Sequence, residues 1–220
     1  WVTAANTNIT YLDIYRRLAA AYRERGLLDE LARLTDARID AGADTPTLVG
    51  LLLEKAAQRR DRGDVEGVIE ALDECLELDP HHFAALRELV ETHRGREDWQ
   101  GAAEALIRIA RLKRSTDEQV WAFSQLAELY HEHLGDLPRA EASLRRALEL
   151  APAHIETIDR LASVLTQQDK PRDAARLLQE LVRRAPSDAV KRDYRIRLAN
   201  TVELAGEARQ AEAMLEQLRA

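Results

Sequence analysis

Apolar residues recur along this chain at the spacing of one face of a helix, in short runs that are regularly interrupted. One run of apolar and small residues consists of Phe123, Leu126, Ala127 and Tyr130. The pattern stops at Gly135 and Asp136 and resumes with Ala140, Leu144, Ala147 and Leu148. Spacings of three and four residues place each run on one side of a helix, and Gly-Asp is typical of a turn. These runs therefore predict a helix, a turn and a second helix.

This arrangement recurs along the chain. The phrase GDLPRAEASLRRALELAP at 135–152 repeats GDVEGVIEALDECLELDP at 63–80, at an offset of 72 residues. Two intermediate copies, EDWQGAAEALIRIARL at 97–112 and DKPRDAARLLQELVRRAP at 169–186, each lie 34 residues after one of these. Weaker copies begin at Gly26 and Gly206. A fixed period of this size is typical of a solenoid, in which each repeat buries its apolar face against its neighbours.

The period predicts six repeats that follow a lead-in at residues 1–11. Their approximate bounds are 12–48, 49–82, 83–119, 120–154, 155–191 and 192–218. Expected N-caps of the second helices are Asp64, Asp98 and Asp136. Prolines in the first turn (Pro138, Pro171) and after the last turn (Pro80, Pro152, Pro186) mark starts and stops. Three-residue insertions at 117–119 and 189–191 either lengthen turns or extend the helices beside them.

The repeat at 120–154 resembles the tetratricopeptide repeat family. The family pattern of aromatic, Leu, Gly or Ala, Tyr, then Ala, Phe or Leu, Ala and Pro is matched by Phe123, Leu126, Ala127, Tyr130, Ala140, Leu144, Ala147 and Pro152. The resemblance covers about nine tenths of the chain. It implies an all-α, right-handed α-solenoid of about six helix-turn-helix repeats. The second repeat departs from the pattern, with Lys55 and Arg59 where the family prefers Leu and Tyr, so we expect its first helix to be rotated or less buried.

The resemblance also implies a non-catalytic scaffold that binds a partner protein segment in a concave groove lined by the first helices. Arginines at the expected groove positions are Arg16, Arg23, Arg60, Arg87 and Arg94. Arg forms bidentate hydrogen bonds with carboxylates, so these residues predict an acidic peptide or a C-terminal carboxylate as ligand.

The alternative is that the same arginines are solvated and paired with Glu24, Glu88 and Glu91. The carboxylate clamp known in the family uses Lys and Asn pairs, whereas Arg16 is followed a turn later by Ala20. That mode of binding is therefore not expected here.

Trp121 is the remaining candidate for partner binding. Phe123 already occupies the aromatic packing position, which leaves Trp121 near the groove or near the joint between repeats. A half-exposed Trp is a typical interface anchor. Packing beneath the insertion at 117–119 is an equally good explanation.

Composition and charge narrow the functional classes. The 220 residues are 45% hydrophobic and carry a net charge of −7, the opposite of what a nucleic-acid binder usually shows. The excess of Arg, with 28 of 32 basic residues, indicates a GC-rich, bacterial genome. No run approaches the about 18 apolar residues that span a bilayer, so no membrane insertion is expected in this segment. The compartment is barely constrained, with the cytoplasm as the default.

No arrangement typical of an enzyme or a metal site occurs in the sequence. His131 and His133 are two residues apart and point to different sides of a helix, with no third ligand at a suitable spacing. The only cysteine, Cys75, lies between Leu72 and Leu76 on an expected buried face, which predicts a core thiol. We therefore expect no enzymatic activity, no cofactor and no metal.

The end of the chain suggests a second kind of function. The last expected helix carries Met214, Leu215 and Leu218, and no polar helix follows to cover them. An exposed apolar end predicts further repeats, or association with another copy or with the residues before Tyr11. The alternative function is therefore a structural spacer or a self-associating repeat array within a larger protein.

Overall fold

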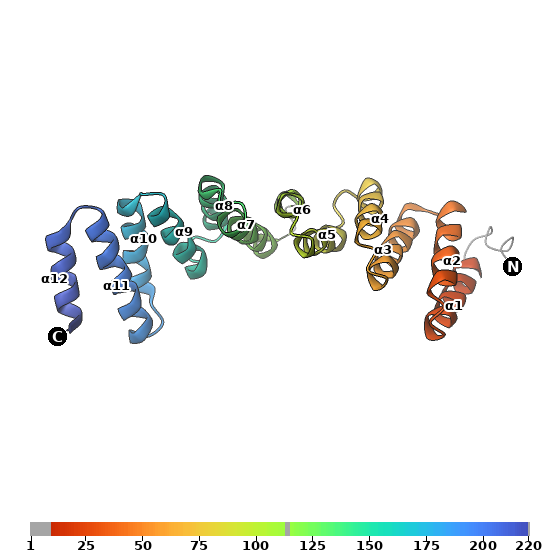
Figure 1. The fold of residues 1–220 in the computed structure, drawn as a ribbon, viewed down its shortest axis with the longest axis horizontal. Helices are drawn as coiled ribbons and strands as arrows, with labels where there is room; N and C mark the ends of the chain where they lie inside the picture. The colour runs from red at the N-terminus through yellow and green to blue at the C-terminus, as the bar shows by residue number, and fades with distance from the viewer. Residues whose placement is uncertain (1–9, 113–114, 220) are drawn as a thin grey trace. The chain divides into compact units, whose positions relative to one another are not determined.

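The computed structural model describes residues 10–112 and 115–219, and the described residues form twelve α-helices and no strand (Figure 1). The helices are α1 (Thr10–Glu24), α2 (Leu28–Asp40), α3 (Thr45–Asp61), α4 (Val65–Leu78), α5 (Phe83–Gly95), α6 (Trp99–Arg111), α7 (Thr116–Glu132), α8 (Leu137–Leu150), α9 (Ile155–Gln167), α10 (Pro171–Arg184), α11 (Asp188–Leu204) and α12 (Ala208–Arg219). The predicted all-α helical-repeat fold is confirmed. Nearly all of the expected lead-in at 1–11 lies outside the described residues.

The chain divides into two compact units, residues 1–105 and residues 106–220, and the division falls within α6. In the first unit the helices α1 to α5 each pack against the next one along the chain, and in the second unit the helices α7 to α12 do the same. This packing between successive elements is what a short sequence period predicts. Odd-numbered helices are the first helices of the repeats, and even-numbered helices are the second.

The second helices begin where the sequence predicts. A carboxylate oxygen of each expected N-cap accepts a hydrogen bond from the backbone N–H three residues later, at 3.0 Å for Asp64, Asp98 and Asp136. Pro138 and Pro171 lie in the first turns of α8 and α10. These contacts satisfy amide groups that have no partner within a helix, so they stabilise the start of each second helix.

The turn before each of these helices requires a left-handed backbone at one residue. Gly63 and Gly135 supply it, with φ of 72° and 63°. At the equivalent positions Glu97 and Asp169 adopt the same conformation, each with φ of 59°. A side chain is disfavoured in this region, so two of the turns carry backbone strain.

Small and large apolar residues alternate in the cores of both units. In the first unit Tyr15, Ala19, Leu31 and Leu51 form a buried cluster that joins α1, α2 and α3. In the second unit a larger cluster includes Leu178, Leu181, Tyr194 and Leu198. Several small residues are fully buried as well, among them Ala56, Ala71, Cys75, Ala140 and Ala147. The prediction that Cys75 is a core thiol is confirmed.

One alternative left open by the sequence is resolved. Both α7 and α11 are 17 residues long, so the insertions at 117–119 and 189–191 extend first helices rather than turns. In α3, the Lys55 ammonium lies 3.5 Å from Asp36 and 4.0 Å from Glu74, and Arg59 lies 2.6 Å from Asp64. Carboxylates on the adjoining second helices and turn thus compensate for the charged residues in α3.

The last helix, α12, is partly covered in the described part of the chain. Met214 is half-buried against the core cluster of the second unit, and Leu215 is half-buried as well. The side chain of Leu218, the third residue of the expected apolar end, lies outside the described residues. Association through this end stays a prediction.

Candidate functional site

Successive first helices are joined by ion pairs between exposed or half-buried side chains. In the first unit, Arg23 on α1 lies 2.8 Å from Glu54 on α3, and Arg60 on α3 lies 2.6 Å from Glu88 on α5. In the second unit the pairs are Arg160 with Glu128 at 2.9 Å and Arg197 with Asp159 at 2.5 Å. We call the surface that carries these pairs in each unit the first-helix face.

The structure shows what each predicted groove arginine contacts. Arg23 and Arg60 make the ion pairs described above. Arg94 lies 3.8 Å from Glu91, and the Arg87 guanidinium lies 5.9 Å from the centre of the Phe83 ring. Arg16 is exposed on α1. The alternative prediction of carboxylate pairing therefore holds for Arg60 and Arg94, while Arg23 pairs with Glu54 rather than Glu24.

Positive charge on the first-helix face is concentrated at α1. Arg16, Arg17 and Arg23 all project from this helix and are exposed. Carboxylates match Arg23 on α1, Arg60 on α3 and Arg94 on α5. Arg16 and Arg17 form no ion pair with another residue that the structure describes. An acidic ligand would therefore meet the largest uncompensated positive charge at α1.

The first-helix face of the second unit is a polar network. The Arg197 guanidinium donates to Asp159 at 2.5 Å and to the hydroxyl of Ser163 at 3.0 Å. Partial burial disfavours the charged form of Arg160, but hydrogen bonds and charges from Glu128 and Glu156 raise its pKa overall. These contacts fix the arginine side chains across α7, α9 and α11.

Trp121 lies on α7 and is half-buried. Near it along the same helix, the hydroxyl of Ser124 is buried and has no hydrogen-bond partner among the described atoms. A half-buried aromatic ring is a suitable apolar contact for a partner. That Trp121 binds a partner stays a prediction.

Sequence reasoning missed a buried polar network in the first unit. The Tyr15 hydroxyl lies 2.8 Å from Glu54 and 3.1 Å from the hydroxyl of Thr35, which in turn accepts from the Gln58 amide at 2.9 Å. Burial raises the pKa of the Tyr15 phenol well above its ordinary value. The signal in the sequence was Gln58, a polar residue at a helix position otherwise occupied by core residues.

Metal binding and membrane insertion find no support in the part of the chain that the structure describes. Within it, no three His, Cys, Asp or Glu side chains are placed to hold a metal ion. His131 donates from Nε2 to the amide oxygen of Gln167 at 2.9 Å. None of the helices at 10–112 and 115–219 is both long and apolar enough to cross a bilayer.

Comparisons with known proteins agree with this fold. A family model described as "Tetratricopeptide repeat" matches residues 122–154. The crystal structure of the MamA protein is similar with a TM-score of 0.57 at 18% identity, over 78% of this chain and 90% of that one. No curated protein matches the sequence.

Two further solved structures are similar at the same level of identity. YrrB, which is described as a TPR protein with an unusual peptide-binding site, has a TM-score of 0.55 at 18% identity over 76% of this chain and 83% of that chain. A Podosopora anserina protein described as a kinesin light chain with nearly identical TPR-like repeats has a TM-score of 0.53, again at 18% identity, over 80% and 96%. Such identities show a shared fold. The family model places one tetratricopeptide repeat at 122–154, and the helix pairs around it share the fold of these structures.

Proposed function

We propose that the chain is a non-catalytic scaffold that binds a segment of a partner protein along its first-helix face. Tetratricopeptide repeats generally mediate protein–protein interactions. The observation that carries the proposal is the pair of exposed arginines on α1, Arg16 and Arg17, which form no ion pair with another residue that the structure describes.

Acidic residues of the partner would bind at α1 and compete for the arginines farther along the face. Exposed ion pairs contribute only about 0–1 kcal/mol to stability, so Arg23 and Arg60 exchange an internal carboxylate for an external one at little cost. Arg87 and Arg94 on α5 would extend this contact. The proposed ligand is therefore an acidic peptide segment held by bidentate arginine contacts.

In the second unit, Trp121 would supply an apolar contact to a partner. The ring is half-buried, so covering its remaining exposed area adds hydrophobic contact without first ordering a mobile side chain. The arginine of the polar network nearest to the chain end, Arg197, is already held by Asp159 and Ser163. We therefore assign charge recognition to the first unit and apolar contact to the second.

A comparative pull-down from a lysate of the source organism tests this proposal. The test variant changes Arg16, Arg60, Arg87 and Arg94 to Glu. The matched control changes four exposed arginines of second helices to Glu, at Arg33, Arg139, Arg145 and Arg146. Both variants must give the far-UV circular dichroism spectrum of the wild type.

The expected result is a captured protein that is lost with the test variant and retained with the control. A synthetic peptide from that protein should then bind more weakly as salt increases. Equal capture by all three proteins would refute binding at the first-helix face. Loss with the control alone would assign binding to the second helices instead.

A further inference from the structure

The exposed side of the second helices changes sign along the chain. The residues that lie two, six, nine and thirteen positions after the N-cap fall on one side of each second helix, because their spacing is four, three and four. We call these four positions the second-helix stripe. On α4 the stripe consists of Glu66, Glu70, Asp73 and Glu77, and on α10 it consists of Arg172, Arg176, Gln179 and Arg183. All eight side chains are exposed.

The difference is not confined to the stripe. Helix α4 contains five acidic residues and no basic residue, and α10 contains four arginines and two acidic residues. The stripe of α2, with Asp29, Arg33, Asp36 and Asp40, is acidic as well. Helix α10 therefore presents a second-helix surface opposite in charge to those of α2 and α4.

Two repeats of the first unit neutralise the first stripe residue with a side chain of the following repeat. Asp29 on α2 lies 3.2 Å from Arg62, the residue that caps the C-terminus of α3. Glu66 on α4 lies 2.6 Å from Arg96, which caps α5 in the same way. The stripe and the C-cap of the next first helix thus form a recurring pair.

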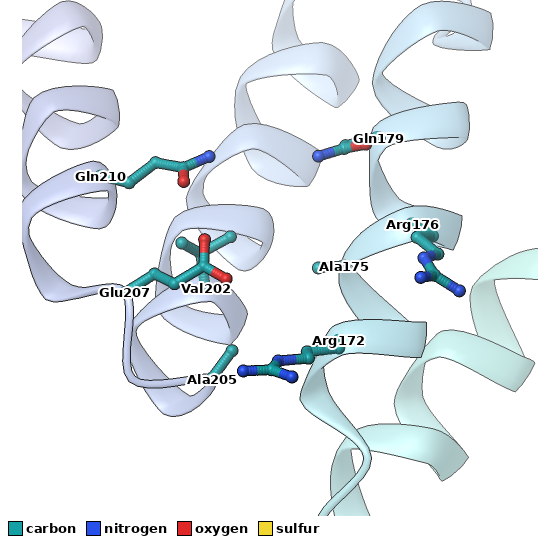
Figure 2. Close-up of a pocket in the computed structure, with 8 residues that line it drawn as sticks. All are labelled: Arg172, Ala175, Arg176, Gln179, Val202, Ala205, Glu207 and Gln210. Carbon is teal, nitrogen blue, oxygen red and sulfur yellow. The ribbon is translucent and has the colours of Figure 1, made fainter.

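In the second unit this pair is missing at α10. The first stripe residue is Arg172, and the residue that caps α11 is Ala205, which carries no charge. Figure 2 shows the Arg172 side chain reaching toward Ala205. No ion pair of Arg172 or Arg183 occurs within the described ranges 10–112 and 115–219, whereas Arg176 lies 3.4 Å from Asp173.

A cleft of about 200 Å³ opens beside this stripe, between α10 and the turn that joins α11 to α12. Its lining includes the apolar side chains of Ala175 and Val202, and the amides of Gln179 and Gln210 face each other across it (Figure 2). Glu207 also lines the cleft but lies within 4 Å of no arginine in the part of the chain that the structure describes. The cleft therefore offers the Arg172 guanidinium at the stripe, the Glu207 carboxylate beside the turn, two amides and an apolar floor.

We propose that this basic stripe and cleft on α10 dock the acidic stripe on α4 of a second copy of the chain. The two helices have the same length of 14 residues, and the spacing of the stripe reads the same in both directions. When two such helices lie antiparallel, Glu77 faces Arg172, Asp73 faces Arg176 and Glu66 faces Arg183. The charges are opposite at three of the four positions, and Glu70 faces the amide of Gln179. Of the three, Glu66 would exchange its contact with Arg96 for one with Arg183.

A second copy is the partner that this geometry favours, because the chain itself carries both matching surfaces. If each copy uses both stripes, the contact is reciprocal and gives a closed dimer; if each uses a different neighbour, it gives a longer assembly. The surface lies on second helices and so leaves the first-helix face available to a partner. Self-association and partner binding can therefore be tested separately.

Sedimentation equilibrium of the full chain tests the proposal, with protein concentrations from about 1 µM to about 1 mM. The wild type should associate at about 0.1 M salt and dissociate at about 1 M, where charges are screened within about 3 Å. A variant with Arg172, Arg176 and Arg183 changed to Glu should have a dissociation constant raised at least about 10-fold. A variant with Glu70, Asp73 and Glu77 changed to Lys should weaken association by a similar factor.

An equimolar mixture of these two variants should associate again, because the reversed charges are complementary. The control changes Arg139, Arg145 and Arg146 on α8 to Glu and should associate like the wild type. If circular dichroism shows that a triple variant is unfolded, the single changes Arg176→Glu and Asp73→Lys replace it in the mixing experiment.

Three results would overturn the proposal. These are a wild type that is monomeric at every concentration at low salt, association that survives both triple variants, and a mixture that does not regain association. A monomeric wild type that binds a poly-glutamate peptide through the α10 arginines would assign the cleft to an acidic partner protein instead.

Discussion

The hydroxyl of Tyr15 lies 2.8 Å from a carboxylate oxygen of Glu54, and this contact joins the first helices of the first two repeats beneath the ion pair of Glu54 with Arg23. Tyr15 is 6% exposed. The same hydroxyl contacts Thr35 on the second helix between them. One buried group thus connects three helices, α1, α2 and α3.

Replacing Tyr15 by Phe should lower the free energy of unfolding by about 1 kcal/mol, because a buried hydrogen bond to a partly exposed carboxylate is lost. Thr35 keeps its contacts with the Leu31 carbonyl and the Gln58 amide, so the loss stays local. Urea unfolding followed by circular dichroism measures the difference. Tyr22→Phe, at a half-buried tyrosine of the same helix, is the control and should change stability little.

The repeat period, the helix pairs and the N-caps could be predicted from the sequence, because each depends on residues close together in the chain. Asp64 and Asp136 signal their own helix starts through the glycine before them. The partners across repeats could not be predicted in this way. Whether Arg23 finds Glu24 or Glu54 depends on the distance between two helices that lie about 30 residues apart in sequence.

The candidate site was predictable in residue type but not in pairing. The arginines on α1, α3 and α5 follow from their spacing, whereas the neutralisation of Arg60 by Glu88 follows only from the packing of the helices. The sequence did not predict Arg172 as a site residue, because Arg172 stands out only by lacking an ion pair with the other described residues. It becomes visible only when the Asp29 and Glu66 pairs are compared with it position by position.

The strained turn at Glu97 offers a stabilising substitution. Glu97→Gly should raise the free energy of unfolding by about 1 kcal/mol. The left-handed conformation costs a residue with a Cβ about 1–2 kcal/mol, and the greater freedom of glycine in the unfolded chain offsets part of the strain that is relieved. The matched variant is Gly135→Ala, at the equivalent turn with open space around it. It should lower stability by a similar amount. A decrease for Glu97→Gly would show that the Glu97 side chain makes a contact that outweighs the strain.

Lys55 occupies a position where an apolar residue fits the repeat better. Its side chain is 21% exposed, and its carboxylate partners lie 3.5 and 4.0 Å away. These separations recover little of the cost of removing an ammonium group from water. Lys55→Leu should therefore raise the free energy of unfolding by about 0.5–1 kcal/mol in denaturant melts. Lys55→Ala removes the alkyl chain as well and should be less stable than Lys55→Leu.

Asp98 makes the first unit sensitive to acid. The backbone N–H of Gly101 is the main cause that lowers the pKa of this carboxyl, partial burial opposes it, and His93 lowers it further. The charged form is thus favoured by folding, so its contribution is present above the ordinary value of about 3.9 and is lost as the pH falls through the lower folded value.

Asp98→Asn keeps a capping oxygen but cannot titrate. Its melting temperature should therefore stay within about 2 °C of the wild type at pH near 7, since Asn and Asp are similar N-caps. Between pH of about 5 and about 3 it should fall less than that of the wild type. Identical acid profiles for the two proteins would mean that Asp98 contributes nothing to the pH dependence.

Cys75 should be unreactive in the folded protein. The side chain is fully buried, and burial, followed by the charge of Asp79, raises the pKa of the thiol. Because the thiolate is the reactive form, a colorimetric disulfide reagent near pH 8 should modify the native chain slowly and the urea-unfolded chain at once. Cys75→Ser places a hydroxyl in this apolar site and should cost about 1–3 kcal/mol, whereas Cys75→Ala loses only packing and should cost less. Rapid modification of the native protein, at a rate independent of denaturant, would show that α4 opens far more readily than its buried face implies.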